Sequence, residues 1–241
     1  MRLRRQIFLE KHMEYLHNGY TLDFPAGTFP LSTDSMLLAD FASLPRNASV
    51  LDLGAGCGTL GVLLCAKDSL CHVTGIELSQ AAHNAAKDNI QRNGLSSRMQ
   101  SICADLCRMP GEITPGSFHC CVSNPPYFSG GAASQSNLIA RRDDFCSTED
   151  LFAAAATALK FGGDFYLVHK PERLAQLCAC AANSGLEPKR LRLIRHTPEK
   201  PVSLILLSCR KGAKPGLIWE ERCLKERSGE PSEYYKRIYH L

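Results

Sequence analysis

The sequence SVLDLGAGCG, residues 49–58, is the most informative part of this 241-residue chain for its fold class. The apolar run that ends at Leu53 predicts a short buried strand, and the glycines at 54, 56 and 58 predict a tight turn into a helix over residues 59–67. Glycines in such a turn allow the backbone to approach a ligand closely. The spacing is not that of a dinucleotide fingerprint, because position 59 holds threonine where that fingerprint needs glycine.

Strands and helices alternate along the rest of the chain. The pattern predicts strands at 72–76, 99–103, 118–123 and 164–169, and helices at 80–92, 147–160 and 172–184. This alternation indicates β-α-β units, so we expect an α/β fold: a doubly wound, mostly parallel sheet with helices on both faces. The runs at 191–194 and 202–208 lack an intervening helix, and we expect them to form an antiparallel C-terminal hairpin at one edge of the sheet.

We expect a single domain over residues 1–241, with a core over 46–241. The first 45 residues contain turn signals and an amphipathic stretch over 34–41, so we expect them to cap the sheet on the substrate side.

The composition is that of an ordinary globular protein, with 44% hydrophobic and 22% charged residues. No apolar run approaches the roughly 20 residues that span a bilayer, and charges interrupt the N-terminus before a secretory signal can form. The 12 cysteines include no Cys-x-x-Cys pair and lie mostly in apolar surroundings. We therefore expect reduced thiols, no metal site and a cytoplasmic protein. Separately, we expect a monomer.

Two acids accompany the glycine turn. Asp52 lies at its start, where a pyrophosphate would be repelled, so the turn favours a cofactor that carries an amino acid and a sulfonium cation. Glu77 ends the second strand, where one carboxylate could accept hydrogen bonds from two ribose hydroxyls. The alternative is that the glycines only make a tight turn and that Glu77 is a surface acid.

The sequence CCVSNPPYF, residues 120–128, ends a buried strand with an amide and two prolines. Prolines lack an N–H and hold the preceding residue extended. The side-chain carbonyl of Asn124 and the backbone carbonyl of Pro125 can therefore point in one direction and accept both hydrogens of a planar amino group. Tyr127 offers a face on which a base could stack, and Phe128 could extend it. The alternative is a proline-rich turn with a core tyrosine.

The glycine turn with Glu77 resembles the S-adenosylmethionine (AdoMet) binding motif of Rossmann-like class I methyltransferases. The resemblance implies that Gly54–Gly58 lies against the methionine part, that Glu77 holds the ribose and that Asp105 contacts the adenine amine. The candidate cofactor-binding residues are Asp52, Gly54, Gly56, Gly58, Glu77, Leu78, Asp105, Leu106 and Asn124.

The Asn-Pro-Pro-Tyr tetrapeptide resembles the signature of methyltransferases that modify adenine N6, guanine N2 or glutamine amides. Thr33–Phe41, Ile139–Asp143 and several C-terminal segments are similar to the bacterial tRNA1(Val) adenine-N6 methyltransferases, which act on the adenine beside the anticodon. This resemblance implies that tRNA is the partner and that the catalytic residues are Asn124, Pro125, Pro126 and Tyr127. Arg142 and Asp143 depart from the family pattern, whereas Arg141 matches it.

Eight lysines and arginines between 189 and 214 make a candidate tRNA-binding face. The candidate substrate-binding residues are Tyr127, Phe128, Arg141, Lys189 and Arg190. A release-factor glutamine methyltransferase is disfavoured, because only about 47 residues precede the first strand where that family carries a helical domain. A ribosomal RNA guanine-N2 methyltransferase stays open. A non-catalytic RNA-binding module is disfavoured by the intact glycines, Glu77 and Asn124.

Overall fold

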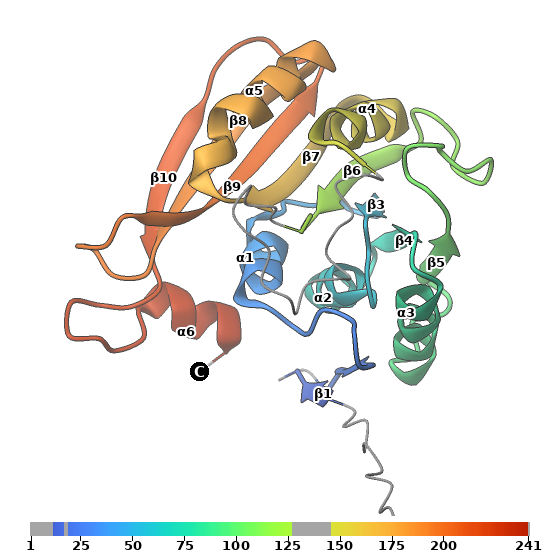
Figure 1. Cartoon of the computed structure of the whole chain (residues 1–241), viewed down its shortest axis with the longest axis horizontal. Coiled ribbons are helices and arrows are strands. Elements are labelled where there is room, and N and C mark those ends of the chain that lie inside the picture. The colour runs from blue at the N-terminus through green and yellow to red at the C-terminus, as the bar shows by residue number, and fades with distance from the viewer. Residues whose placement is uncertain (1–11, 17–18, 127–145, 241) are drawn as a thin grey trace, which may run out of the picture.

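The computed structural model describes residues 12–16, 19–126 and 146–240 (Figure 1). Its main sheet has eight strands in the order β10-β8-β9-β7-β6-β3-β4-β5. These strands are β3 (Ser49–Leu53), β4 (His72–Glu77), β5 (Met99–Cys103), β6 (Phe118–Ser123), β7 (Leu159–His169), β8 (Leu186–Arg195), β9 (Val202–Lys211) and β10 (Ile218–Cys223). A separate antiparallel pair consists of β1 (His12–Tyr15) and β2 (Thr21–Phe24). No described helix is long and apolar enough to cross a membrane.

Helices cover both faces of the sheet, as the sequence predicts (Figure 1). They are α1 (Thr33–Phe41), α2 (Thr59–Lys67), α3 (Gln80–Arg92), α4 (Thr148–Ala158), α5 (Leu174–Asn183) after the short 3₁₀ turn η1 (Pro171–Arg173), and α6 (Glu233–Tyr239). Successive residues of a strand point to opposite faces. Cys120 and Val122 of β6 therefore join the core shared with α1, α2 and α3, whereas Cys121 joins the core shared with α4 and α5.

The C-terminal strands differ from the prediction in their position. β8 and β9 pair antiparallel as expected, but they do not form the edge of the sheet. β9 inserts between β7 and β8 and is antiparallel to both, and β10 pairs parallel to β8 outside them. The predicted antiparallel hairpin is confirmed, but its place at the edge was predicted wrongly, because β10 follows a loop and no helix precedes it to indicate a further strand.

The start of β7 was also predicted wrongly. The helix ends at Ala158, and the strand begins at Leu159 instead of Asp164. Gly162 and Gly163 fall between the predicted helix and the predicted strand, but they lie inside the observed strand, and Gly162 has a φ of 80°. A Cβ on Gly163 would come within 2.9 Å of the His119 carbonyl oxygen, so glycine permits close pairing of β7 with β6 here.

The N-terminal segment covers the sheet only in part. The stretch predicted as amphipathic forms α1, whose first turn is capped by the Ser32 hydroxyl. β2 is held to α3 instead of to the sheet: the backbone N–H of Asp23 donates to Asn89 Oδ1 at 2.8 Å. The Asn89 side chain also donates to the carbonyl oxygens of Asp23 and Cys57. One buried amide therefore ties β2 and α3 to the glycine turn.

Candidate active site at the carboxyl ends of the strands

The glycine turn after β3 requires glycine at each of its three positions. Gly54, Gly56 and Gly58 have φ values of 78°, 55° and 81°, in the left-handed region that favours glycine. The backbone N–H groups of Gly54 and Ala55 donate to the Ile76 carbonyl at 3.0 and 2.9 Å, which folds the turn over the end of β4. Apart from its chain neighbours, no atom of the described residues lies within 4 Å of a Cβ placed on Gly54 or Gly56, so this part of the structure leaves space beside the turn.

Glu77 is positioned by the turn and by the start of α3. Its Oε2 accepts a hydrogen bond from the N–H of Gly56 at 2.9 Å, and its Oε1 accepts one from the N–H of Ser79 at 2.6 Å. Glu77 as a whole is 9% exposed. These bonds fix the orientation of a charged group where β4 ends, as the predicted ribose contact requires.

Asp52 is a buried carboxylate with only one weak donor near it among the described residues, the Gly61 amide. Both of its oxygens are inaccessible and accept no hydrogen bond of ordinary geometry from the described residues. Burial and, to a smaller extent, the Glu77 carboxylate raise the pKa of Asp52 to about 7, and the Gly61 amide opposes this by less. A buried carboxyl of this kind is stabilised as an anion only by a cation or by further donors, which the described residues do not supply.

The other cofactor candidates lie along the same edge of the sheet. Asp105 follows β5, and its Oδ1 accepts a hydrogen bond from the N–H of Cys107 at 2.9 Å. The N–H of Ala104 donates to the Glu77 carbonyl at 3.1 Å, which brings the two strand ends together. Leu78 is exposed and Leu106 is half-buried.

Asn124 follows β6 at the same edge. Just before it, the Ser123 hydroxyl donates to the Leu53 carbonyl at 2.8 Å, so the end of β6 lies against the start of the glycine turn. Asn124 Nδ2 donates to the Ser35 hydroxyl of α1 at 3.0 Å, and this sets which end of the amide faces α1. Pro125 is half-buried and Pro126 is exposed. The structure thus brings Asn124 together with the predicted cofactor residues.

Ser35 is a functional candidate that the sequence reasoning missed. It lies in the segment Thr33–Phe41, which was matched to a family without a role for any single side chain. Its side chain is buried and its backbone N–H donates to the Ser32 hydroxyl at 3.3 Å, so the first turn of α1 holds the hydroxyl that Asn124 binds. Tyr127, Phe128 and Arg141 lie outside the described residues, and their predicted roles stay predictions.

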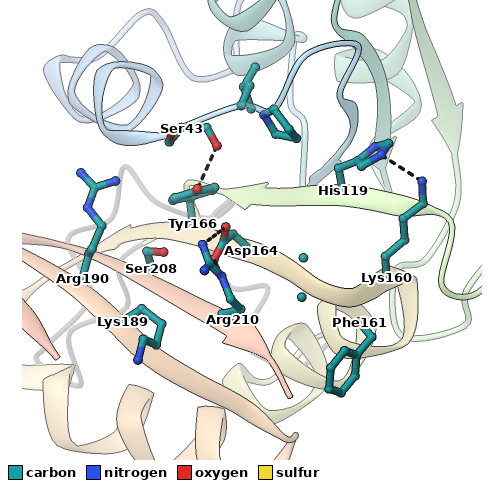
Figure 2. A pocket seen from close by; sticks show the side chains of 14 residues that line it. Ser43, His119, Lys160, Phe161, Asp164, Tyr166, Lys189, Arg190, Ser208 and Arg210 are labelled. Atoms are coloured by element: carbon teal, nitrogen blue, oxygen red, sulfur yellow. Dashed lines mark hydrogen bonds and ion pairs between the residues drawn. The ribbon is translucent and has the colours of Figure 1, made fainter. Parts of the chain in front are cut away.

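Lys189 and Arg190 do not lie at this edge. They line a separate cavity of about 660 Å³ (Figure 2). The Arg190 guanidinium lies 4.5 Å from the centre of the Phe41 ring, at the last residue of α1, whereas Asn124 binds the first turn of that helix. The two sites are therefore at opposite ends of α1.

The cations between 189 and 214 also do not form one face, contrary to the prediction. The Arg192 side chain is 8% exposed and pairs with Asp40 and Glu220 at 2.7 Å each. Lys211 donates to two carbonyl oxygens at the end of α4. Alternate residues of a strand point to opposite faces, so a basic run in the sequence is divided between buried ion pairs, helix capping and solvent.

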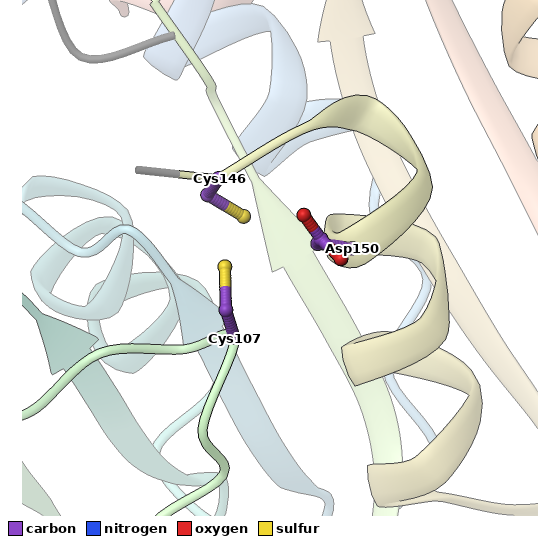
Figure 3. A group of neighbouring side chains, drawn as sticks. All are labelled: Cys107, Cys146 and Asp150. Carbon is purple, nitrogen blue, oxygen red and sulfur yellow. The ribbon is translucent and has the colours of Figure 1, made fainter. Parts of the chain in front are cut away.

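One group of side chains has metal-ligating chemistry. The ligand atoms of Cys107, Cys146 and Asp150 all lie within 4.8 Å of one another (Figure 3). Sequence spacing could not reveal this group, because its cysteines come from distant segments. Asp150 already accepts hydrogen bonds from the backbone and hydroxyl of Ser147, and no fourth such ligand joins the three in the described part of the chain. A closed structural zinc site needs four ligands, so the group alone does not define one.

The fold and the site define a class of protein. The sheet order, with one antiparallel strand among parallel ones, and the glycine turn at the carboxyl ends are those of a Rossmann-like class I methyltransferase. A predicted O-methyltransferase of Agrobacterium tumefaciens superposes with a TM-score of 0.73 at 22% identity, over 86% of this chain and 96% of that one. A 16S rRNA N2 methyltransferase of T. thermophilus, solved with AdoMet and guanosine, has a TM-score of 0.60 at 24% identity, over 84% and 50%.

The sequence comparisons identify the family within this class. Residues 30–177 match the methyltransferase small domain family. A tRNA1(Val) (adenine(37)-N6)-methyltransferase of Shewanella sediminis is 31% identical over 90% of this chain and 92% of its own length. The chain therefore belongs to the methyltransferase small domain family and, within it, to the group of tRNA1(Val) adenine-N6 methyltransferases.

Proposed function

We propose that this protein transfers a methyl group from AdoMet to the exocyclic N6 of an adenine in tRNA, the adenine beside the anticodon of tRNA1(Val). The observation that carries the proposal is Asn124, an amide fixed by Ser35 at the end of β6 and joined through Ser123 to the strand that begins the glycine turn. The names of the relatives support the substrate class. We further propose a cytoplasmic monomer with one domain.

The residues around the glycine turn fit AdoMet. Asp52 is a buried carboxylate without a cationic partner among the described residues, and the amino acid and sulfonium parts of AdoMet carry the positive charge that would stabilise it as an anion. The open space beside Gly54 and Gly56 leaves room for a ligand against the backbone. Bound AdoMet would supply an electrophilic methyl group. The resemblance to the AdoMet-binding motif places the adenosine half of the cofactor along the same edge. Its ribose would bind Glu77, and its adenine would lie near Leu78, Asp105 and Leu106.

Asn124 and Pro125 would act on the target amine. The lone pair of an adenine N6 is delocalised into the ring, so the nitrogen is a weak nucleophile. Two fixed carbonyl oxygens accepting its hydrogens would favour a pyramidal nitrogen and stabilise the positive charge that develops on it. The methylated ammonium is acidic enough to lose its proton to water, so no dedicated base is needed. Tyr127 would stack on the base after it has left its own stack.

Replacing Asn124 by alanine tests the carbonyl pair. We expect methyl transfer to tRNA to fall by more than 100-fold, because one preorganised oxygen is lost, a loss of about 3 kcal/mol in transition-state stabilisation. AdoMet affinity, measured by calorimetry, should change little. Asn84→Ala on the exposed side of α3 is the matched control and should retain full activity. Full methylation by the Asn124 variant would refute the mechanism.

The identity of the product tests the substrate. Unmodified tRNA is treated with the protein and AdoMet, digested to nucleosides and analysed by mass spectrometry. We expect N6-methyladenosine in tRNA1(Val). N2-methylguanosine, or methylation of a release factor in place of tRNA, would overturn the assignment in favour of one of the other planar-nitrogen enzymes.

A further inference from the structure

The cavity that Lys189 and Arg190 line (Figure 2) lies at the amino ends of β6 and β7, whereas Asn124 follows the carboxyl end of β6. Its walls include His119 near the start of β6 and Lys160 near the start of β7. Asn124 follows the end of β6, five residues after His119. A strand rises about 3.3 Å per residue, so the two positions are roughly 16 Å apart. A ligand in this cavity is therefore not part of the AdoMet site.

His119 and Lys160 lie side by side, and each directs a hydrogen-bond donor toward the other. The His119 Nδ1 accepts a hydrogen bond from the backbone N–H of Ser49 at 3.0 Å. The ring hydrogen must therefore reside on Nε2, which lies 3.0 Å from the Lys160 ammonium nitrogen. An ammonium group also only donates. Burial and the neighbouring Lys160 charge lower the pKa of His119, so the ring is neutral and keeps this tautomer.

An acceptor reached by both donors would resolve this conflict, and an oxyanion provides one. The surrounding charge favours the same ligand. The walls carry the cations Lys160, Lys189, Arg190 and Arg210 against one acid, Asp164, which pairs with Arg210 through two hydrogen bonds of 2.9 Å. Figure 2 shows these side chains around one hollow. The cavity is thus a positively charged pocket with two donors side by side on its wall.

We propose that this pocket binds a phosphate group of the RNA backbone, with Lys160 and His119 Nε2–H as donors and with Lys189 and Arg190 adding positive charge. The inference rests on the proposed function for the choice of RNA as the phosphate source. A phosphate here lies too far from Asn124 to belong to a single nucleotide bound at the active site. The pocket would therefore contact tRNA at a point remote from the target adenine and position it without reading its sequence.

The salt dependence of tRNA binding tests the proposal. Each phosphate contact contributes about one unit to the slope of log affinity against log salt concentration. We expect Lys160→Gln to reduce the slope by about one and to weaken binding of unmodified tRNA roughly 3- to 10-fold at low salt. AdoMet affinity should not change. Lys87→Gln on the exposed side of α3 is the matched control and should leave the slope unchanged.

A second measurement examines the donor pair directly. The Nε2 resonance of His119 is followed by NMR while inorganic phosphate is added to the cofactor-free protein. We expect a saturable shift that Lys160→Gln weakens. An unchanged slope and affinity in Lys160→Gln would overturn the proposal. Phosphate binding without any effect on tRNA would overturn the RNA assignment and indicate a small phosphorylated ligand. Failure of the proposed function would be seen separately, as the wrong methylated nucleoside with wild-type protein.

Discussion

Replacing Asp52 by asparagine should change how the stability of the cofactor-free protein depends on pH. The pKa of this buried carboxyl is raised from 3.8 to about 7. Between these values the native state holds a proton that the unfolded chain has released. The contribution of this proton to stability is complete below about pH 4 and is lost as the pH rises through 7. The wild-type protein therefore becomes less stable with rising pH on account of this group, and the asparagine variant does not.

The size of the effect follows from the shift. One pKa unit corresponds to 1.36 kcal/mol, so the full loss from a carboxyl raised from 3.8 to about 7 is about 4 kcal/mol. Part of that loss has occurred by pH 5. Between pH 5 and pH 8 the remaining change is about 3 kcal/mol. The buried amide of the variant also lacks partners, so the absolute stabilities differ for a second reason, but that difference does not vary with pH.

Urea unfolding of both proteins at pH 5 and pH 8 measures this quantity. The wild-type free energy of unfolding minus that of Asp52→Asn should fall by about 3 kcal/mol from pH 5 to pH 8. Other groups that titrate in this interval contribute equally to both proteins and cancel. If the two pH profiles are parallel, the carboxylate is solvated or hydrogen-bonded in solution. Asp52 would then not be the unsatisfied anion on which the AdoMet fit depends.

Three further substitutions address the elements around the site. Ser35→Ala should lower kcat about 10-fold with little change in AdoMet affinity, because Asn124 loses its hydrogen bond to the Ser35 hydroxyl. Steady-state kinetics with an unchanged kcat would argue against this role. Gly56→Ala should weaken AdoMet binding about 5-fold, because alanine costs about 1 kcal/mol at a φ of 55°, and calorimetry giving an unaltered affinity would contradict the expectation. Asn89→Ala should lower the free energy of unfolding by about 2–4 kcal/mol, since it leaves buried backbone groups of β2 and of the glycine turn unpaired; urea unfolding would measure it, and a loss below 1 kcal/mol would show that water replaces the amide.

Local sequence signals predicted those parts of the site that lie within one β-α unit. The turn over residues 54–58, Glu77 at the end of β4 and Asn124 at the end of β6 each follow directly from a strand in the sequence. Parallel strands bring their carboxyl ends to one edge, so the meeting of these residues could be predicted from the alternation alone. The fold class could be predicted from the sequence for the same reason.

Contacts between distant segments could not be predicted. The hydrogen bond from Asn124 to Ser35 spans 89 residues, and no local pattern marks that serine as its partner. The pairing of β10 with β8 was likewise not predictable, because strand propensity does not determine which strand of a sheet an added strand will pair with. The basic run after Lys189 predicted a single charged face that the structure does not have. The prediction failed because counting charges along a sequence ignores which face of a strand each side chain occupies.

α1 connects the two proposed binding regions. Its first turn presents the Ser35 hydroxyl to Asn124, and its last residue, Phe41, lies beneath the Arg190 guanidinium of the basic cavity. The far end is fixed in turn, because the Tyr166 hydroxyl donates to the Ser43 carbonyl at 2.9 Å and Lys67 donates to three carbonyl oxygens there. A helix held at both ends keeps a constant separation between its first and last turns. In the proposed mode of binding, the segment expected only to cap the sheet therefore sets the spacing between the target amine and the phosphate contact, and a tRNA would have to match that spacing to engage both.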